Sequence, residues 1–333
     1  MQAASNGMSE PRSPVPTERR SATFGRPQLV QVLVEYGTII ALVVLGAVLA
    51  ILSPFFLTVD NLLQVLLQAA INLLIALGMT FVILTGGIDL SVGSTAALAG
   101  VTLATLIKSG VPWPFAVLAA LGAGLLVGLI NGVLISRVRI APFIVTLGML
   151  SVVRGTALVA TNGRPIFGFP ESFNQALAGT LGPVPMPVVI AGGAALICWL
   201  VLRYTRLGEY TYAIGGNEEA TRLSGVNVAF YKTSIYMLCS LFAALAGIVL
   251  AARLRSAEPI AASGYELDAI AATVMGGTSL MGGEGGVRGT VIGALIIATL
   301  RNGLNLLNVQ AFYQQLAIGL VIILAVLLDR FRR

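Results

Sequence analysis

The sequence predicts an all-α protein, a polytopic bundle of about ten transmembrane helices. Hydrophobic residues make up 57% of the chain and charged residues only 10%, and the mean hydropathy is +0.92. Soluble domains carry roughly 25% charged residues. The apolar runs approach the ~20 residues that a helix needs to cross a bilayer. The alternating, roughly ten-residue pattern of a membrane β-barrel is absent.

Ten apolar runs are expected to form the spans. They are 36–53, 62–84, 90–108, 114–136, 141–161, 187–203, 232–252, 267–282, 289–307 and 314–329. An even number of spans places both termini on one side of the membrane. Fourteen basic residues fall in segments that this assignment places in the cytoplasm, against four outside. The positive-inside rule therefore predicts that the N and C termini are cytoplasmic.

The chain divides into a tail and one membrane domain. Residues 1–35 are rich in Pro, Ser, Arg and Gln and predict a disordered cytoplasmic tail. Residues 36–333 form the transmembrane domain. Its largest outer loop is 162–187, in which Phe167, Phe169 and Phe173 are expected to anchor the loop over the outer mouth. A plain connector is the alternative interpretation of this loop.

A polar stretch separates the sixth and seventh runs, and its central loop is 204–231. It predicts one short helix: Asn217 caps its start, Glu218 and Glu219 suit the positive end of the dipole, and Gly225 ends it. So short a helix needs tertiary contacts or a partner. We expect a docking element for a cytoplasmic protein, with an ordinary capped helix as the alternative. The docking candidates are Gly216, Asn217, Glu218, Glu219, Arg222 and Gly225.

Two glycine-rich segments, 78–94 and 276–289, each place Gly-Gly at the end of a run and follow it with one acid, Asp89 or Glu284. Such interrupted helices, in corresponding parts of two halves, mark the transport path of many membrane carriers. A glycine-rich connector with a capping acid is the alternative. The expected hinge or turn residues are Gly86, Gly87, Gly276, Gly277, Gly282 and Gly283. Gly124, Gly128 and Gly132 form a stripe that predicts close helix packing.

Polar side chains within the runs are candidates to line a translocation path. Two of them, Arg154 and Arg301, are costly inside a membrane and should face a water-filled cavity or an acidic or carbonyl partner. Hydrogen bonding between helices is the competing explanation for the others. The path candidates are Asn72, Asp89, Ser91, Ser94, Asn131, Arg154, Arg301, Asn302 and Asn305.

The residues that are missing exclude several kinds of chemistry. The chain has no His, and its two cysteines, Cys198 and Cys239, lie in apolar runs without metal-ligand spacing. Neither lysine stands in the Gly-Lys-Ser/Thr setting of a phosphate-binding loop. We therefore expect no catalytic residues, no metal site and no ATP bound in that way. The spread of basic residues over loops and tails does not indicate nucleic-acid binding.

Four segments, taken together, resemble one family. They are GMTFVILTGGIDLSVGS (78–94), SRVRIAPFIVTLGMLSVVRGTALVATNGRPI (136–166), GEYTYAIGGNEEATRLSGVNV (208–228) and IAATVMGGTSLMGGEGGVRGTVIGALIIATLRNGLNLL (270–307). They are similar, in this order, to the ribose-type permeases, the membrane subunits of bacterial ATP-driven importers of small sugars. The resemblance covers about 40–330 and leaves the particular sugar open.

The resemblance implies a working scheme. Two permease copies, or this chain with a paralogue, would form a pore in the lipid of the bacterial inner membrane. A cytoplasmic ATPase pair would grip the helix at 217–225 and use ATP and Mg²⁺, so this chain itself would bind no cofactor. A periplasmic binding protein would deliver a monosaccharide such as ribose, xylose, arabinose or galactose.

Three other classes are weighed against this scheme. An ion-coupled secondary transporter would need an ionisable group inside the membrane, and Asp89 is the best candidate. A membrane enzyme would need a nucleophile with a base, or metal ligands, which the sequence does not offer. A structural scaffold would leave the two intramembrane arginines unexplained.

Overall fold

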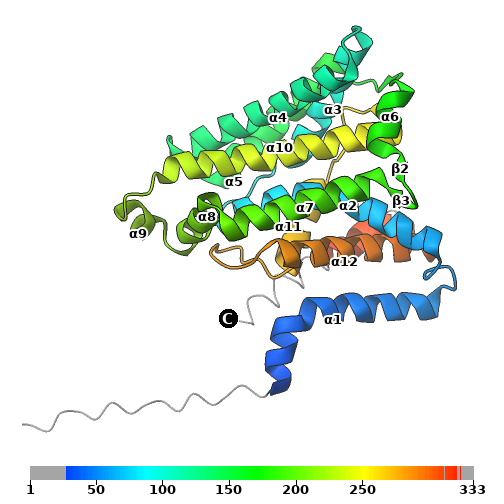
Figure 1. Ribbon diagram of the computed structural model, residues 1–333, viewed down its shortest axis with the longest axis horizontal. Coiled ribbons are helices and arrows are strands. Elements are labelled where there is room, and N and C mark those ends of the chain that lie inside the picture. Colours follow the sequence, from blue (N-terminus) through cyan, green and yellow to red (C-terminus); the bar gives the residue numbers. More distant parts are fainter. Residues whose placement is uncertain (1–27, 311, 321–322, 324–333) are drawn as a thin grey trace, which may run out of the picture.

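The fold is a bundle of roughly parallel helices, seen in a computed structural model that describes residues 28–310, 312–320 and 323 (Figure 1). The helices are α1 (Gln28–Leu52), α2 (Val59–Leu84), α3 (Val92–Lys108), α4 (Trp113–Ser136), α5 (Pro142–Thr161), α6 (Glu171–Ala178), α7 (Met186–Tyr204), α8 (Arg206–Gly216), α9 (Glu218–Leu223), α10 (Val228–Leu254), α11 (Tyr265–Met275) and α12 (Val287–Leu306). The strands are β1 (Ile166–Phe167), β2 (Thr180–Leu181), β3 (Val184–Pro185) and β4 (Ser256–Ala257).

Helices α2 and α10 form the centre of the bundle. Helix α10 packs against α2, α3 and α4, while α2 also contacts α7, α11 and α12. Most side chains of α2 and α10 are buried, whereas the outer helices α5 and α7 bury about a quarter of theirs. Exposed large apolar side chains such as Val152 and Val159 cover the outside of the bundle. So much exposed apolar surface is what a surrounding lipid phase, and not water, would cover.

Six helices of the described chain are long and apolar enough to cross a membrane: α2, α4, α5, α7, α10 and α12. Helix α3 and the Gly37–Leu52 part of α1 are shorter apolar helices. The chain is therefore a helical membrane protein, as its composition predicts, and the total of about ten spans stays a prediction. The last expected run, 314–329, lies partly outside the described residues.

The structure corrects the expected span at 267–282. Helix α11 ends at Met275 after 11 residues, and a glycine-rich turn follows it. At 1.5 Å per residue it is only about 16 Å long, too short to cross a bilayer. The glycines at 276–277 end the helix because Gly277 takes a positive φ of 89°. The expected eighth span is thus a half-length helix inserted beside α2 and α12.

The tail and the polar stretch also differ from expectation. Helix α1 begins at Gln28, so residues 28–35 are helical although the sequence places them in the tail; residues 1–27 lie outside the described chain. The 204–231 loop holds two helices, because α8 precedes the expected short helix α9. Thr205 caps α8 by accepting a hydrogen bond from the Gly208 N–H. This helix start was not predicted from the sequence.

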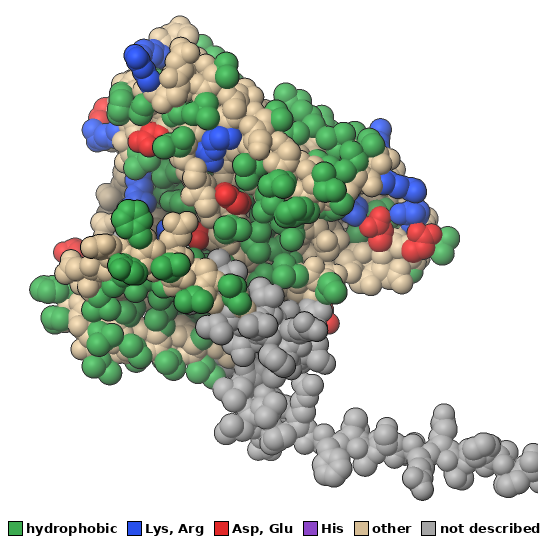
Figure 2. Space-filling model, turned by 180° about the vertical axis from the view of Figure 1, so that it is seen from behind, with side chains coloured by type: hydrophobic (Ala, Val, Ile, Leu, Met, Phe, Trp, Pro, Cys, Tyr) green, Lys and Arg blue, Asp and Glu red, His purple; other side chains and the backbone are tan. Residues whose placement is uncertain are grey.

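The two ends of the bundle carry different loop structures. Helices α8 and α9 lie at one end, and α6 with the β2–β3 hairpin lies at the other (Figure 1). The 162–187 segment packs through Phe173, which is fully buried, and through Phe169, whose ring lies 5.2 Å from that of Phe173. Phe167 is 66% exposed and is not an anchor, because its strand β1 pairs edge-on with β4. Figure 2 shows the α8–α9 end turned to the right, with acidic and basic side chains gathered at its tip.

The glycine stripe of α4 packs as predicted. A methyl group on Gly128 or Gly132 would meet the α10 backbone at Tyr236 or Thr233. On Gly124 it would meet the Ala244 side chain and the Ser240 carbonyl. The three glycines therefore allow α4 and α10 to approach at backbone distance.

Candidate functional site: a polar cavity and a glycine junction

A polar cavity of about 260 Å³ lies between α2, α11 and α12. We call it the polar cavity. It brings together three of the predicted path residues, Asn72 from α2 and Arg301 and Asn305 from α12. The other lining residues are Gln68, Arg253, Tyr265, Asp268, Ile297, Ala298 and Gln314. Five further polar residues of this lining were not predicted from the sequence, because their elements converge only in the folded protein: Gln68, Arg253, Tyr265, Asp268 and Gln314.

An ion pair forms one wall of the polar cavity. Arg301 Nη2 donates to Asp268 Oδ2 at 2.6 Å. Asp268 is 4% exposed and lies in the first turn of α11, where the helix dipole also favours an anion. The expected acidic partner of Arg301 is therefore Asp268. Burying these charges is tolerable because each neutralises the other.

Amides complete the cavity. The Asn72 Oδ1 is buried and has no hydrogen-bond partner in the described chain. The Asn305 Oδ1 accepts a hydrogen bond from Gln314 Nε2 at 2.8 Å. Asn302 lies elsewhere, because it exchanges two hydrogen bonds with Asn61 at 2.8 and 3.0 Å. The cavity thus offers carboxylate, amide and guanidinium groups, which suit the hydroxyl groups of a sugar.

A second group of predicted path residues forms a closed internal network. Asp89 Oδ1 accepts from the Ser91 N–H at 2.9 Å and the Ser91 hydroxyl at 2.6 Å. Asn131 Nδ2 donates to Ser91 Oγ at 2.9 Å, and Ser94 Oγ donates to the Ser91 carbonyl at 2.8 Å. All four residues are buried. This network joins the start of α3 to α4 and lies outside the polar cavity.

Arg154 has carbonyl partners. Its Nη1 donates to the Pro259 carbonyl at 2.7 Å and the Ala261 carbonyl at 2.8 Å. The expectation of an acidic or carbonyl partner is confirmed for this arginine. Its contacts hold the segment between β4 and α11 against α5.

The two glycine-rich segments meet beside a third glycine pair, Gly215-Gly216 at the end of α8. The Gly283 N–H donates to the Leu84 carbonyl at 2.9 Å, which joins the turn after α11 to the end of α2. Gly215, at the end of α8, packs so closely that a Cβ there would collide with the Leu84 carbonyl oxygen. Gly86, Gly282 and Gly283 take positive φ values of 74°, 88° and 77°. We call this contact of Leu84, Gly86, Gly215, Gly282 and Gly283 the glycine junction.

Gly276 and Gly87 are close-packed for separate reasons. A Cβ on Gly276 would collide with Gly289 of α12. A Cβ on Gly87 would lie 2.5 Å from the Tyr236 hydroxyl oxygen of α10. The predicted turn glycines are therefore positions at which the backbone conformation or the available space admits no side chain.

Helix α9 has the predicted ends and an ion network. Asn217 Oδ1 accepts from the Ala220 N–H at 2.9 Å, and Gly225 takes a φ of 86°. Glu218 pairs with Arg222 at 3.1 Å and with Lys232 of α10 at 2.9 Å. Partial burial by itself raises the pKa of the Glu218 carboxyl. The hydrogen bonds and positive charges of Lys232 and Arg222 have the larger combined effect, so the pKa of Glu218 lies below its usual value. The pair with Lys232 ties α9 to the start of α10.

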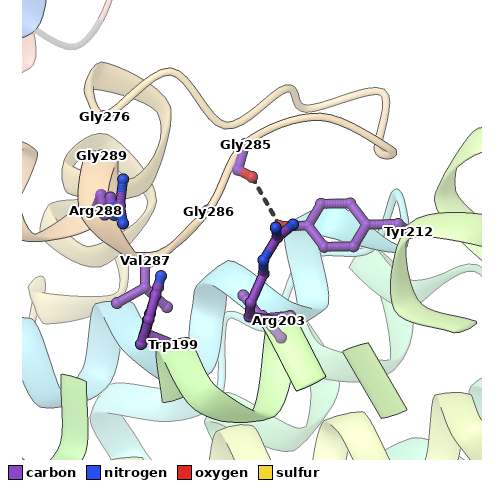
Figure 3. A pocket seen from close by; sticks show the side chains of 10 residues that line it. Trp199, Arg203, Tyr212, Gly276, Gly285, Gly286, Val287, Arg288 and Gly289 are labelled. Carbon is purple, nitrogen blue, oxygen red and sulfur yellow. Dashed lines mark hydrogen bonds between the residues drawn. The ribbon is translucent and has the colours of Figure 1, made fainter. Parts of the chain in front are cut away.

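A larger cavity of about 660 Å³ lies between the end of α7, α8 and the start of α12 (Figure 3). We call it the basic cavity. Trp199 and Arg203 reach it from the last turns of α7, Tyr212 from α8 and Arg288 from the first turn of α12. The Tyr212 hydroxyl donates to the Gly285 carbonyl at 2.9 Å, and the Arg288 guanidinium lies 5.6 Å from the centre of the Trp199 ring. The remaining lining residues are Leu202, Gly276, Gly285, Gly286, Val287 and Gly289.

Comparison with known proteins places the chain in a family. Residues 61–326 match the family model described as "Branched-chain amino acid transport system / permease component". The ribose import permease RbsC of Escherichia coli K12 is 51% identical over 89% of this chain and 94% of its own length. RbsC of Bacillus subtilis is 50% identical over 90% of this chain and 94% of its own, and the D-allose permease AlsC of E. coli K12 is 42% identical over 89% and 91%. No solved structure matches. The chain is a member of this permease family.

Proposed function

We propose that the chain is the transmembrane permease subunit of an ATP-driven importer, and that its substrate is ribose or a closely related monosaccharide. The observation that carries the proposal is the 51% identity to a ribose import permease over most of both chains. The polar cavity supports it, since amides and a charged pair on half-buried walls are suited to sugar hydroxyls. No phosphate-binding loop occurs in the sequence, so ATP and Mg²⁺ belong to a partner ATPase and this chain carries no cofactor.

The substrate path runs through the polar cavity. Its wall is built on α11, a half-length helix, and α12, the two helices that flank the 276–286 turn. Discontinuous helices of this kind bind substrate in many transporters. Asn72 supplies an amide side chain to the lining, and Asp268 with Arg301 supplies charged groups for polar contacts with hydroxyls. The Asp89, Ser91, Ser94 and Asn131 network holds α3 in place beside this path.

The ATPase engages the α8–α9 end. Helix α9 projects Leu223, 80% exposed, and the exposed Glu219 side chain away from the bundle. Both ends of α9 are capped, and Glu218 pairs with Lys232 of α10, so α9 can move as one rigid unit. Helix α8 then reaches the glycine junction, so a push on α9 is carried by backbone contact to the ends of α2 and α11.

Orientation in the membrane follows from this assignment. The α8–α9 end and both termini face the cytoplasm, and the α6 and β2–β3 end faces the periplasm, where a sugar-binding protein docks. In this proposal the chain crosses a bacterial inner membrane ten times, with α11 and the 276–286 turn together making the eighth crossing, and a second permease copy or paralogue completes the pore. The basic residues at 203–232 support the cytoplasmic assignment through the positive-inside rule.

The test is reconstitution of the permease with its ATPase and its sugar-binding protein. Vesicles that hold the complex should take up labelled ribose only when ATP is present. Unlabelled ribose should compete better than allose, arabinose or galactose. Uptake that depends on a proton or sodium gradient and not on ATP would assign the chain to the ion-coupled transporters instead.

A further inference from the structure

The basic cavity holds two positive charges and no negative one. Arg203 and Arg288 line it from α7 and α12, and no Asp or Glu is among its lining residues. In the described chain neither arginine forms an ion pair, whereas Arg222, Arg255 and Arg301 each do. Both side chains are exposed, so water and salt screen their mutual repulsion in part, and an anion bound between them would neutralise it.

The backbone of the basic cavity also favours an anion. The first turn of α12, at Val287–Gly289, faces the cavity, and no side chain caps it. The free N–H groups of a helix start attract phosphate groups. Gly285, Gly286 and Gly289 lack side chains there, so a ligand can approach the backbone closely (Figure 3). This helix start supports the assignment only because the two arginines stand beside it.

The end of α7 beside the basic cavity has the residue composition of a membrane interface. Helix α7 turns the exposed apolar side chains of Leu196, Ile197 and Leu200 outward, and it ends in Trp199, Arg203 and Tyr204. Trp and Tyr at the end of a span mark the membrane interface, and arginine there extends toward the headgroups. An acyl chain can therefore follow α7 while its headgroup enters the cavity.

We propose that the basic cavity binds a phosphate group, held by Arg203, Arg288 and the start of α12, and that an anionic phospholipid supplies it. The Trp199 ring fixes Arg288 by a cation–π contact, so one wall is already ordered. Gly285, which lines the cavity, follows two residues after Gly283 of the glycine junction. A bound headgroup would brace α7, α8 and the turn before α12 against one another.

The chain offers a direct fluorescence test. It has two tryptophans, Trp113 and Trp199. In full-length Trp113→Phe permease, Trp199 is the only tryptophan and reports on the basic cavity. The protein is placed in bilayers that contain phosphatidylglycerol or phosphatidylcholine brominated near the headgroup, in an unbrominated background. We expect Trp199 to be quenched at lower mole fractions of phosphatidylglycerol, by about fivefold for each arginine.

Variants and a competitor decide the outcome. Arg203→Gln with Arg288→Gln should abolish the preference for phosphatidylglycerol, while Arg206→Gln, an exposed arginine outside the cavity, should keep it. Equal quenching by the two lipids in the parent protein, or equal losses with Arg206→Gln, would overturn the proposal. With equal quenching by the two lipids, a change in Trp199 fluorescence on adding inorganic phosphate, absent from the double variant, would show a site for free phosphate, and the lipid proposal would fail. Size-exclusion chromatography confirms that each variant is folded.

Discussion

At the scale of single residues, the most consequential pair is Asp268 with Arg301. Arg301→Leu should reduce sugar uptake strongly, because it removes a charged wall of the polar cavity. It should also lower the free energy of unfolding by about 3–5 kcal/mol, since it leaves the buried carboxylate of Asp268 unpaired. The loss of stability is expected because the partner of Arg301 is buried.

The control for this prediction is the paired variant Asp268→Asn with Arg301→Gln, which keeps polar groups of similar size and removes both charges. We expect it to recover most of the thermal stability measured in detergent while uptake of labelled ribose stays low. Uptake at the wild-type rate in the paired variant would show that the charges serve only the packing of α11 on α12.

A second prediction at this scale concerns Gly87. Gly87→Ala would place its Cβ 2.5 Å from the Tyr236 hydroxyl oxygen, and such overpacking costs about 1–3 kcal/mol. Tyr236→Phe alone should be close to wild type, because that hydroxyl has no hydrogen-bond partner in the described chain. The double variant should regain the melting temperature and uptake that Gly87→Ala loses.

Gly87→Val, with its larger side chain, should block transport even when residue 236 is Phe. Failure of Tyr236→Phe to rescue Gly87→Ala would contradict this contact.

At the scale of elements, helix α9 is expected to be the surface that the ATPase grips. Glu219→Lys reverses a charge on its exposed face and breaks the 2.9 Å pair with Arg222. Gly225→Val forces a β-branched residue into a φ of 86° and disturbs the end of the helix. Both variants should reach the membrane, lose the ATPase during detergent purification and lose sugar-stimulated ATP hydrolysis. A wild-type ratio of ATPase to permease in both would place the docking surface elsewhere, with the 137–140 loop next.

Helix α8 permits a sharper test, because its last two glycines differ only in their surroundings. Gly215→Ala would drive a methyl group into the Leu84 carbonyl, whereas nothing lies within 4 Å of a Cβ on Gly216. Gly215→Ala should lower sugar uptake about tenfold or more, as expected of overpacking by 1–3 kcal/mol, while the ATPase still binds. Gly216→Ala should take up sugar at the wild-type rate. Equal uptake by the two variants would mean that the glycine junction does not transmit movement of α9 to the ends of α2 and α11.

At the scale of the whole molecule, the orientation can be tested by cysteine labelling. Both native cysteines, Cys198 and Cys239, are buried and should not react. Two exposed serines provide the labelling sites. Ser172 lies on α6, and Ser224 lies just after α9 at the other end of the bundle. A membrane-impermeant maleimide added to intact cells should label Ser172→Cys, and should label Ser224→Cys only after the membrane is opened. The reverse pattern would invert the proposed topology.

What the sequence determined by itself rests on local physics. Hydropathy predicted a helical membrane protein, the residue pattern around Asn217 and Gly225 predicted both ends of α9, and the stripe of Gly124, Gly128 and Gly132 predicted close packing in α4. Each of these signals is complete within a few turns of chain. The family resemblance rested on four such local segments, and the comparisons confirmed it.

Tertiary structure alone decided which distant residues meet. Asp268 and Arg301 are 33 residues apart, and the glycine junction joins Leu84 to residues more than a hundred positions away. Composition could not separate Asn302, which pairs with Asn61, from Asn305, which lines the polar cavity, since both are amides on one helix. The Gly276-Gly277 pair indicated a turn, but only the structure showed that α11 ends there at Met275, with Gly277 at a φ of 89°. Which residues meet across the bundle depends on how all the helices pack together, so no single segment of the sequence shows it.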